Sequence, residues 1–420
     1  MVDGYQKRTL KNGLRVVCER IPHVRSVSLG VWLGVGSRNE QTHNNGISHF
    51  IEHMLFKGTT QRSAKQIADE LESVGGQLNA FTAKEYTCYY ARMLDEHLDI
   101  GINLLADILF NSLFEELEIE KEKKVILEEI KMYEDSPDEM VHDLFAQTMW
   151  QNHALGRPIL GTVEAVQNNN RDSLLAYLSE MYLPEKTVIS AVGNLDEDLF
   201  IQKIEAAFEH WQHSTKRDNG SEEPPMSHPC SAYNKYRDTE QVQICLGFPG
   251  ISQYHREKYS MHILNNILGG GTSSRLFQEI RERQGLAYSV YSYHSAYRDS
   301  GLFCIYAATS PDNVQVVLDS IVDQVNNVCE NPTPEEEIEK NKNQLRGNLL
   351  LSLESISTRM SRLGKSEVCL GRIVSENEMI AAMREVTGEG IAQLARDIFV
   401  PSRQVLVTVG PGSDQIKLKW

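Results

Sequence analysis

Two histidines and a glutamate lie close together within the stretch Asn44 to Thr59. His49 and His53 are four residues apart, with Glu52 between them. In a helix, residues at i and i+4 stand one turn apart on the same face, so both imidazoles can reach a single divalent ion. Glu52 projects beside them and can act as a base for a water held by that ion. The spacing therefore predicts a metal site with a general base.

A helix that presents these groups must be anchored by its opposite side. At about 100° per residue, one stripe of this stretch is apolar: Ile47, Phe50, Ile51 and Met54. The alternative is a solvated polar helix face that happens to carry two histidines. The opposed apolar stripe favours the metal site, in the order His-x-x-Glu-His.

A catalytic zinc ion usually has three protein ligands, so a third must come from elsewhere in the chain. The predicted helix from about Glu115 to Tyr133 carries several glutamates, and the sequence alone does not choose among them. Glu122 and Glu129 are seven residues apart on one stripe, so both can face inward. The alternative for this helix is a solvated acidic face.

The segment His49 to Thr59, reading HFIEHMLFKGT, resembles the zinc helix of the pitrilysin-type (inverzincin) metallopeptidases, the family of insulin-degrading enzyme and mitochondrial processing peptidase. The resemblance extends over nearly the whole chain. It implies one Zn²⁺ per chain, bound by His49, His53 and Glu129. It also implies that Glu122 orients these ligands from behind and that Glu52 is the catalytic base.

The same resemblance implies how a peptide is held. A short strand resembles the sheet edge to which the family adds an extended peptide, and the alternative is an ordinary core strand. Its residues are Asn79, Ala80, Phe81 and Thr82. Arg281 and Tyr288 resemble the pair that reaches the active site from the opposite half, where Arg holds a substrate carbonyl or carboxylate and Tyr stabilises the oxyanion. The alternative is a surface Arg and a core Tyr.

The length of 420 residues predicts two domains. Residues 213–232 are polar and rich in Pro and Ser, which indicates a linker between an N-terminal zinc-binding domain, 1–212, and a C-terminal domain, 233–420. We expect an α+β fold in which each domain is a mainly antiparallel sheet covered by helices, as in the processing-peptidase (LuxS-like metallohydrolase) type that the resemblance implies.

The second half of the sequence repeats the first. The segment Tyr182 to Gly193 aligns without gaps on Phe399 to Gly410, and His49 to Thr59 lies on His262 to Thr272. In the second copy, Asn265 and Asn266 replace the glutamate and the second histidine. Neutral amides are poor zinc ligands and cannot act as a base, so the second domain is expected to keep the fold but to have no metal site.

Composition restricts the partners and the compartment. The net charge of −16, from 58 acidic and 42 basic residues, disfavours nucleic acid and anionic membranes and favours cationic partners such as basic peptides. Seven cysteines without a Cys-x-x-Cys pair fit a reducing compartment. The N-terminus lacks an apolar signal region and no apolar run is long enough to span a bilayer, so we expect a cytoplasmic protein.

The resemblance is to the catalytic beta subunit of mitochondrial processing peptidase and its bacterial two-domain relatives. The long glycine-rich loop of the non-catalytic subunit is absent, and the short run Gly269 to Gly271 lacks the Lys-Ser/Thr of a nucleotide-binding loop. Because larger members enclose a chamber with two such halves, the resemblance implies a homodimer in which Arg281 and Tyr288 act on the partner's zinc. The predicted function is a zinc endopeptidase for unstructured peptides, and the alternative is a non-catalytic scaffold or binding subunit.

Overall fold

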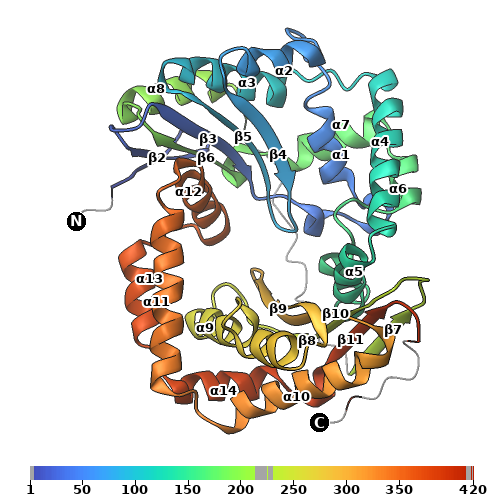
Figure 1. Cartoon of the computed structure of the whole chain (residues 1–420). Helices are drawn as coiled ribbons and strands as arrows, with labels where there is room; N and C mark the ends of the chain where they lie inside the picture. The colour runs from blue at the N-terminus through green and yellow to red at the C-terminus, as the bar shows by residue number, and fades with distance from the viewer. Residues whose placement is uncertain (1–3, 213–224, 226–229, 413–417, 419) are drawn as a thin grey trace. The chain divides into compact units, whose positions relative to one another are not determined.

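The computed structural model describes residues 4–212, 225, 230–412, 418 and 420. Contacts divide the chain into two compact units. Unit 1 comprises Met1–Ile130, Arg157–Ser221 and Leu351–Val374, and unit 2 comprises Lys131–Gly156, Glu222–Leu350 and Ser375–Trp420. Each unit contains one sheet with its own helices (Figure 1).

Unit 1 is built on a six-stranded sheet in the order β1-β2-β6-β3-β5-β4. All neighbours are antiparallel except the parallel pair β2 and β6. The strands are β1 (Gln6–Thr9), β2 (Arg15–Arg20), β3 (Ser26–Leu33), β4 (Gln77–Thr82), β5 (Thr87–Leu94) and β6 (Thr187–Gly193). The central strands β3 and β6 are almost wholly buried, whereas β4 lies at an edge and alternates between exposed and half-buried residues.

Helices cover both faces of this sheet. They are α1 (Ile47–Met54), α2 (Ala64–Glu72), α3 (Leu98–Phe110), α4 (Glu116–Glu134, which runs on past the end of the first unit 1 segment), α6 (Val163–Asn168), α7 (Arg171–Met181), α8 (Glu197–Phe208) and α12 (Ile356–Leu370). One face carries the main core, and the other packs Trp32 against Met360 and Leu363 of α12. Gly364 makes this close approach possible, because a Cβ there would lie 2.1 Å from Trp32 Nε1.

Unit 2 repeats this plan with five strands in the order β7-β11-β8-β10-β9. The strands are β7 (Ser231–Lys235), β8 (Val242–Pro249), β9 (Ala287–Ala296), β10 (Gly301–Thr309) and β11 (Val405–Val409). The helices are α5 (Pro137–Met149), α9 (Lys258–Gly269), a π-helix (Phe277–Arg283), α10 (Val314–Glu330), α11 (Glu335–Ser352), α13 (Glu376–Arg384) and α14 (Gly388–Ile398). Helix α5 packs on one face of this sheet, and the main core of the unit lies on the other.

The internal repeat inferred from the sequence corresponds to equivalent strands. β6 and β11 each follow a one-turn 3-10 helix that begins with proline, Pro184–Lys186 and Pro401–Arg403. Each strand is parallel to one neighbour and antiparallel to the other. Strand β6 ends at Gly193, and β11 is followed by Gly410. Both glycines have a positive φ, 146° and 145°, a backbone conformation that residues with a side chain rarely adopt.

The prediction of two similar α+β domains is confirmed. The division of contacts differs from the predicted contiguous boundaries, because residues 131–156 join unit 2 and residues 351–374 join unit 1. The apolar stripes of α5 and α12 do not indicate which of the two sheets each helix covers. The sequence alone therefore could not predict that these two segments pack in the other unit. The predicted linker, 213–232, falls mostly outside the described residues. Among the helices that the structure describes, none combines the length and apolar character needed to cross a bilayer.

Candidate metal centre

Helix α1 is short and is fixed at its N-terminus by a buried carboxylate. Glu40 accepts hydrogen bonds from the backbone N–H groups of Gly46 (2.7 Å) and Ser48 (2.9 Å), which would otherwise lack partners at the start of the helix. Burial raises the pKa of Glu40, and these hydrogen bonds oppose that shift. Gly46 has a φ of 91°, and a Cβ there would lie 2.6 Å from Leu160 O, so glycine is required at this turn.

The two histidines of α1 face the same carboxylate oxygen of α4. Glu129 Oε2 lies 3.7 Å from His49 Nε2 and 3.9 Å from His53 Nε2. These separations are too long for hydrogen bonds. They are close to the ligand separation of about 3.4 Å expected around an ion held tetrahedrally at about 2.0–2.1 Å. The three groups therefore fit a metal ion such as Zn²⁺.

The protonation state of His49 suits a metal ligand. Burial, and then the neighbouring His53, lower the pKa of His49 to about 3, so the ring is neutral at neutral pH. A neutral imidazole is the form that binds metal ions. Within the described part of the chain, the buried Nδ1 atom of His49 has no hydrogen-bond partner.

Glu122 lies directly behind His53. Its Oε2 atom is 3.0 Å from His53 Nδ1 and its Oε1 atom is 2.6 Å from Lys57 Nζ. Burial opposes ionisation of Glu122, but the hydrogen bonds from His53 and Lys57 outweigh it and lower the pKa of this carboxyl group. An ionised Glu122 can accept a hydrogen bond from the Nδ1–H group of His53, which leaves the Nε2 lone pair on the side of Glu129. This arrangement is typical of metal-bound histidines.

Helix α4 supplies both glutamates, and only part of the predicted stripe is buried. Glu122 is 4% exposed and Ile126 is fully buried, whereas Val125 is 49% exposed. The inward face of α4 is therefore narrow, because Val125, between the two glutamates in sequence, is exposed to solvent.

Glu52 is held by the edge strand of the sheet. Thr82 Oγ1 donates a hydrogen bond of 2.5 Å to Glu52 Oε2. Burial raises the pKa of Glu52, and the hydrogen bond from Thr82 opposes this effect. A carboxylate of raised pKa on the same helix face as His49 and His53 can take a proton from a water and release it again.

The predicted peptide-binding residues form most of strand β4, which pairs only with β5 on one side. The backbone N–H of Ala83 bonds to Tyr86 O, and the alternating antiparallel pattern then directs the N–H of Ala80 away from β5. That N–H donates instead to the side chain of the adjacent Asn79, at 2.8 Å. The free edge therefore carries a backbone donor without a strand partner among the described residues. Phe81 is 38% exposed beside it.

Arg281 and Tyr288 lie in unit 2 and contact each other. The Arg281 guanidinium carbon is 4.5 Å from the ring centroid of Tyr288 and 4.7 Å from that of Phe277. Tyr288 is 77% exposed rather than a core residue. The two side chains therefore form one cation-π stack, in a different unit from the three groups that face one another on α1 and α4.

In unit 2, the amide side chains of Asn265 and Asn266 occupy the positions that correspond to Glu52 and His53. Asn266 Nδ2 donates to Asn341 Oδ1 (2.6 Å) and to Gln344 Oε1 (3.0 Å). Ser292 Oγ donates to Asn265 Oδ1 at 2.9 Å. At this position α9 is tied to its neighbours by neutral hydrogen bonds.

Lys57 and Glu40 did not emerge from the sequence as parts of this site. Lys57 is four residues after His53, so helical spacing could have placed it near the histidines. Glu40 precedes α1 by several irregular residues, and no sequence pattern assigns it to the helix end.

The profile of the family described as Insulinase (Peptidase family M16) matches residues 15–163, and that of the Peptidase M16 inactive domain matches residues 168–345. The chain is 46% identical over 394 residues to the uncharacterized zinc protease YmxG of Bacillus subtilis, covering 94% of this chain and 95% of that protein. The chain belongs to peptidase family M16. The M16 chain is also 42% identical to the uncharacterized zinc protease SCO5738 of Streptomyces coelicolor, covering 98% and 90%.

Solved structures share the fold of this M16 chain. A protease from Helicobacter pylori superposes with a TM-score of 0.92 at 22% identity, covering 97% of this chain and 99% of that one. A peptidase M16 inactive domain from Pseudomonas fluorescens gives a TM-score of 0.89 at 19% identity, covering 99% and 100%. His49, Glu52, His53, Glu122 and Glu129 all lie within the insulinase match, whereas Arg281 and Tyr288 lie within the inactive-domain match.

Proposed function

We propose that this M16 chain is a zinc metalloendopeptidase with one catalytic zinc ion per chain, held by His49, His53 and Glu129. The observation that carries the proposal is the approach of three ligand atoms to one another on α1 and α4, at separations that suit zinc and not hydrogen bonding. The relationship to proteins named zinc proteases supports the same reaction class.

Each group at this site would have a separate role in peptide hydrolysis. Bound zinc supplies a Lewis acid that polarises the peptide carbonyl and makes a water acidic. Glu52 takes the proton of the attacking water and returns it to the leaving amine. The burial that raises its pKa helps it to carry that proton between the two steps. Glu122 keeps the ring of His53 oriented toward the ion.

The substrate would be an extended peptide that adds to the free edge of β4. The N–H of Ala80 is available there once the Asn79 side chain turns away, and Thr82 connects the same strand to Glu52. Pairing along β4 would therefore fix a peptide beside the proposed base. This mode of binding requires an unstructured segment and does not read a fixed sequence.

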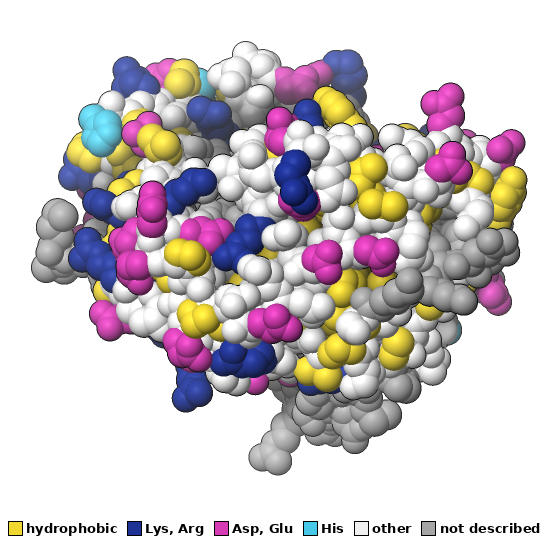
Figure 2. Space-filling view, turned by 60° about the horizontal axis from the view of Figure 1, so that its bottom comes forward, with side chains coloured by type: hydrophobic (Ala, Val, Ile, Leu, Met, Phe, Trp, Pro, Cys, Tyr) yellow, Lys and Arg dark blue, Asp and Glu magenta, His cyan; other side chains and the backbone are white. Residues whose placement is uncertain are grey.

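We further propose that the enzyme is a homodimer enclosing a chamber, in which Arg281 and Tyr288 act on the partner's zinc site. Tyr288 is exposed, so its hydroxyl can meet a substrate. Basic peptides suit the acidic net charge. The face in Figure 2 nevertheless mixes Lys and Arg with Asp and Glu side chains, so this face offers no single-sign surface for attraction.

The test compares the wild-type chain with Glu52→Gln and His53→Ala on a library of unstructured peptides. Glu52→Gln should keep its zinc and lose roughly 10²–10⁴-fold in kcat/KM, because only the base is removed. His53→Ala should lose both zinc and activity. If zinc-loaded wild-type protein cleaves no peptide in the library but binds some of them, the non-catalytic binding role would replace the enzyme.

A further inference from the structure

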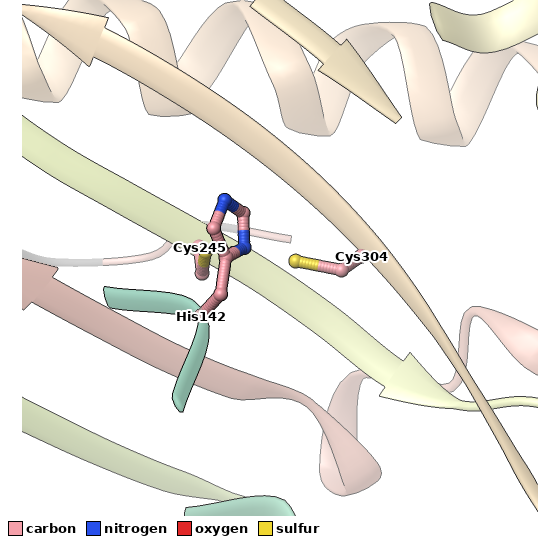
Figure 3. A group of neighbouring side chains, drawn as sticks. All are labelled: His142, Cys245 and Cys304. Carbon is pink, nitrogen blue, oxygen red and sulfur yellow. Dashed lines mark hydrogen bonds between the residues drawn. The ribbon is translucent and has the colours of Figure 1, made fainter. Parts of the chain in front are cut away.

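Unit 2 contains a second group of metal-ligating side chains, His142, Cys245 and Cys304. His142 comes from α5, and the two cysteines come from the neighbouring strands β8 and β10 (Figure 3). Their ligand atoms all lie within 4.8 Å of one another. The antiparallel register pairs Cys245 with Tyr306 and Cys304 with Gly247, so the two thiols are diagonal neighbours on one sheet face.

The separations suit a thiophilic cation. Cys245 Sγ lies 3.4 Å from His142 Nδ1. A tetrahedral ion with sulfur at about 2.3 Å and nitrogen at about 2.0 Å would hold these two atoms about 3.5 Å apart. Cys304 reaches the same point from the adjacent strand, so a small movement of this side chain completes a Cys₂His set.

The imidazole is already held in the orientation that a ligand needs. His142 Nε2 is 3.1 Å from the hydroxyl of Tyr291, which can accept a hydrogen bond from Nε2–H and leave the Nδ1 lone pair free to bind. The hydroxyl of Tyr293 lies 2.9 Å from Nδ1. A cation at this site would take the place of the Tyr293 hydroxyl proton on that lone pair.

The surroundings favour a neutral complex. Both cysteines are fully buried among apolar side chains that include Val141 and Phe145. Two thiolates and a divalent cation cancel in charge, so the complex can be buried there at low electrostatic cost.

A path for entry exists on the His142 side. His142 is only half-buried, and Tyr291 next to it is 37% exposed. The ion can therefore approach the ring first, and the two thiols lie behind it.

We propose that unit 2 binds a second divalent cation of the zinc type through His142, Cys245 and Cys304, with a fourth position left for water. This site is independent of the proposed catalytic zinc. Binding would release the thiol protons and join α5 to strands β8 and β10, so its effect would be on the stability of unit 2. Because the three ligands of this second site are distant in the sequence, no spacing motif predicts it.

The test counts metal in a background without the first site. His53→Ala protein, purified under reducing conditions with added zinc chloride, should retain about one zinc per chain. Adding Cys304→Ser should remove that zinc, and adding His142→Gln should do the same at a position that is only half-buried. The matched control is Cys88→Ser, which alters a fully buried thiol of unit 1 and should keep the zinc.

Cobalt chloride provides an independent signal, because thiolate ligation of Co²⁺ produces charge-transfer absorption in the near ultraviolet. This absorption should appear in His53→Ala and in the Cys88→Ser control and be absent without Cys304 or His142. Equal zinc in all four variants would overturn the proposal. So would thiol titration of the unfolded, metal-free protein that finds Cys245 and Cys304 joined in a disulfide. Neither result depends on peptidase activity, so the catalytic proposal stands or falls separately.

Discussion

Glu52 of α1 and Glu122 of α4 have pKa values shifted in opposite directions. Burial raises the pKa of Glu52, whereas His53 and Lys57 outweigh burial and lower the pKa of Glu122. Opposed shifts of this kind separate the roles of two carboxylates in one site. Glu122 remains an ionised acceptor behind a ligand, and the raised pKa of Glu52 suits a group that takes up a proton and releases it again.

We predict that Glu122→Gln weakens zinc binding by about 10–100-fold, because a neutral amide holds His53 less firmly and reduces its basicity. Competition with a chromogenic chelator measures the affinity. Glu120→Gln is the control, since Glu120 lies on the same helix, is paired with Lys123 and is exposed. An affinity equal to that of the control would show that Glu122 does not support the ligands.

Thr82→Val should move the acidic limb of the pH profile of kcat/KM to higher pH. The hydrogen bond from Thr82 favours ionised Glu52, so its loss lets burial raise the pKa of Glu52 further. A base that protonates at higher pH loses activity earlier as the pH falls. Thr82→Ser keeps the hydroxyl and should keep the wild-type limb. Identical limbs in Thr82→Val and Thr82→Ser would contradict this role.

At the scale of elements, the sequence predicts what depends on nearby residues. The i, i+4 histidines and the apolar stripe of α1 are local, and so are the paired segments that became β6 and β11. Strand β1 has no apolar pattern that would predict it, because its four residues are polar and largely exposed. Which sheet α5 covers and which sheet α12 covers depends on contacts between residues distant in the sequence. The apolar stripes of the two helices are similar, so they do not predict this packing.

Ala80→Pro should raise KM for peptides about 3- to 10-fold, the effect of losing one backbone hydrogen bond. Proline removes the N–H that faces the free edge of β4 and spares the ladder to β5. Ala80→Val keeps the N–H and suits a strand, so its KM should match the wild type. Peptide kinetics with equal zinc content in both variants provide the measurement. Equal KM values in the two variants would exclude β4 as the peptide-binding edge.

The two units of the chain share a fold but carry different side chains at the corresponding helices. In unit 1, α1 presents histidines to a glutamate, and in unit 2, α9 presents amides to other amides. Sequence comparison of the two halves predicts this asymmetry, because the substitutions Asn265 and Asn266 are visible directly. The choice of Glu129 among the glutamates of α4 is different. It depends on which turn of that helix faces α1, and only tertiary structure or family resemblance supplies it.

The proposed homodimer predicts complementation between two inactive chains. Glu52→Gln removes the base and Arg281→Ala removes the proposed contact from the other half, so each homodimer should be impaired at both of its sites. A hybrid dimer contains one site with neither change, if Arg281 acts on the partner's zinc. Random exchange at equal amounts makes half of the dimers hybrid, so activity should recover to about one quarter of wild type. Mass-tagged chains report hybrid formation, and peptide cleavage reports activity. Hybrids that form and stay inactive would mean that Arg281 does not act across the dimer, because action within one chain leaves every hybrid site altered.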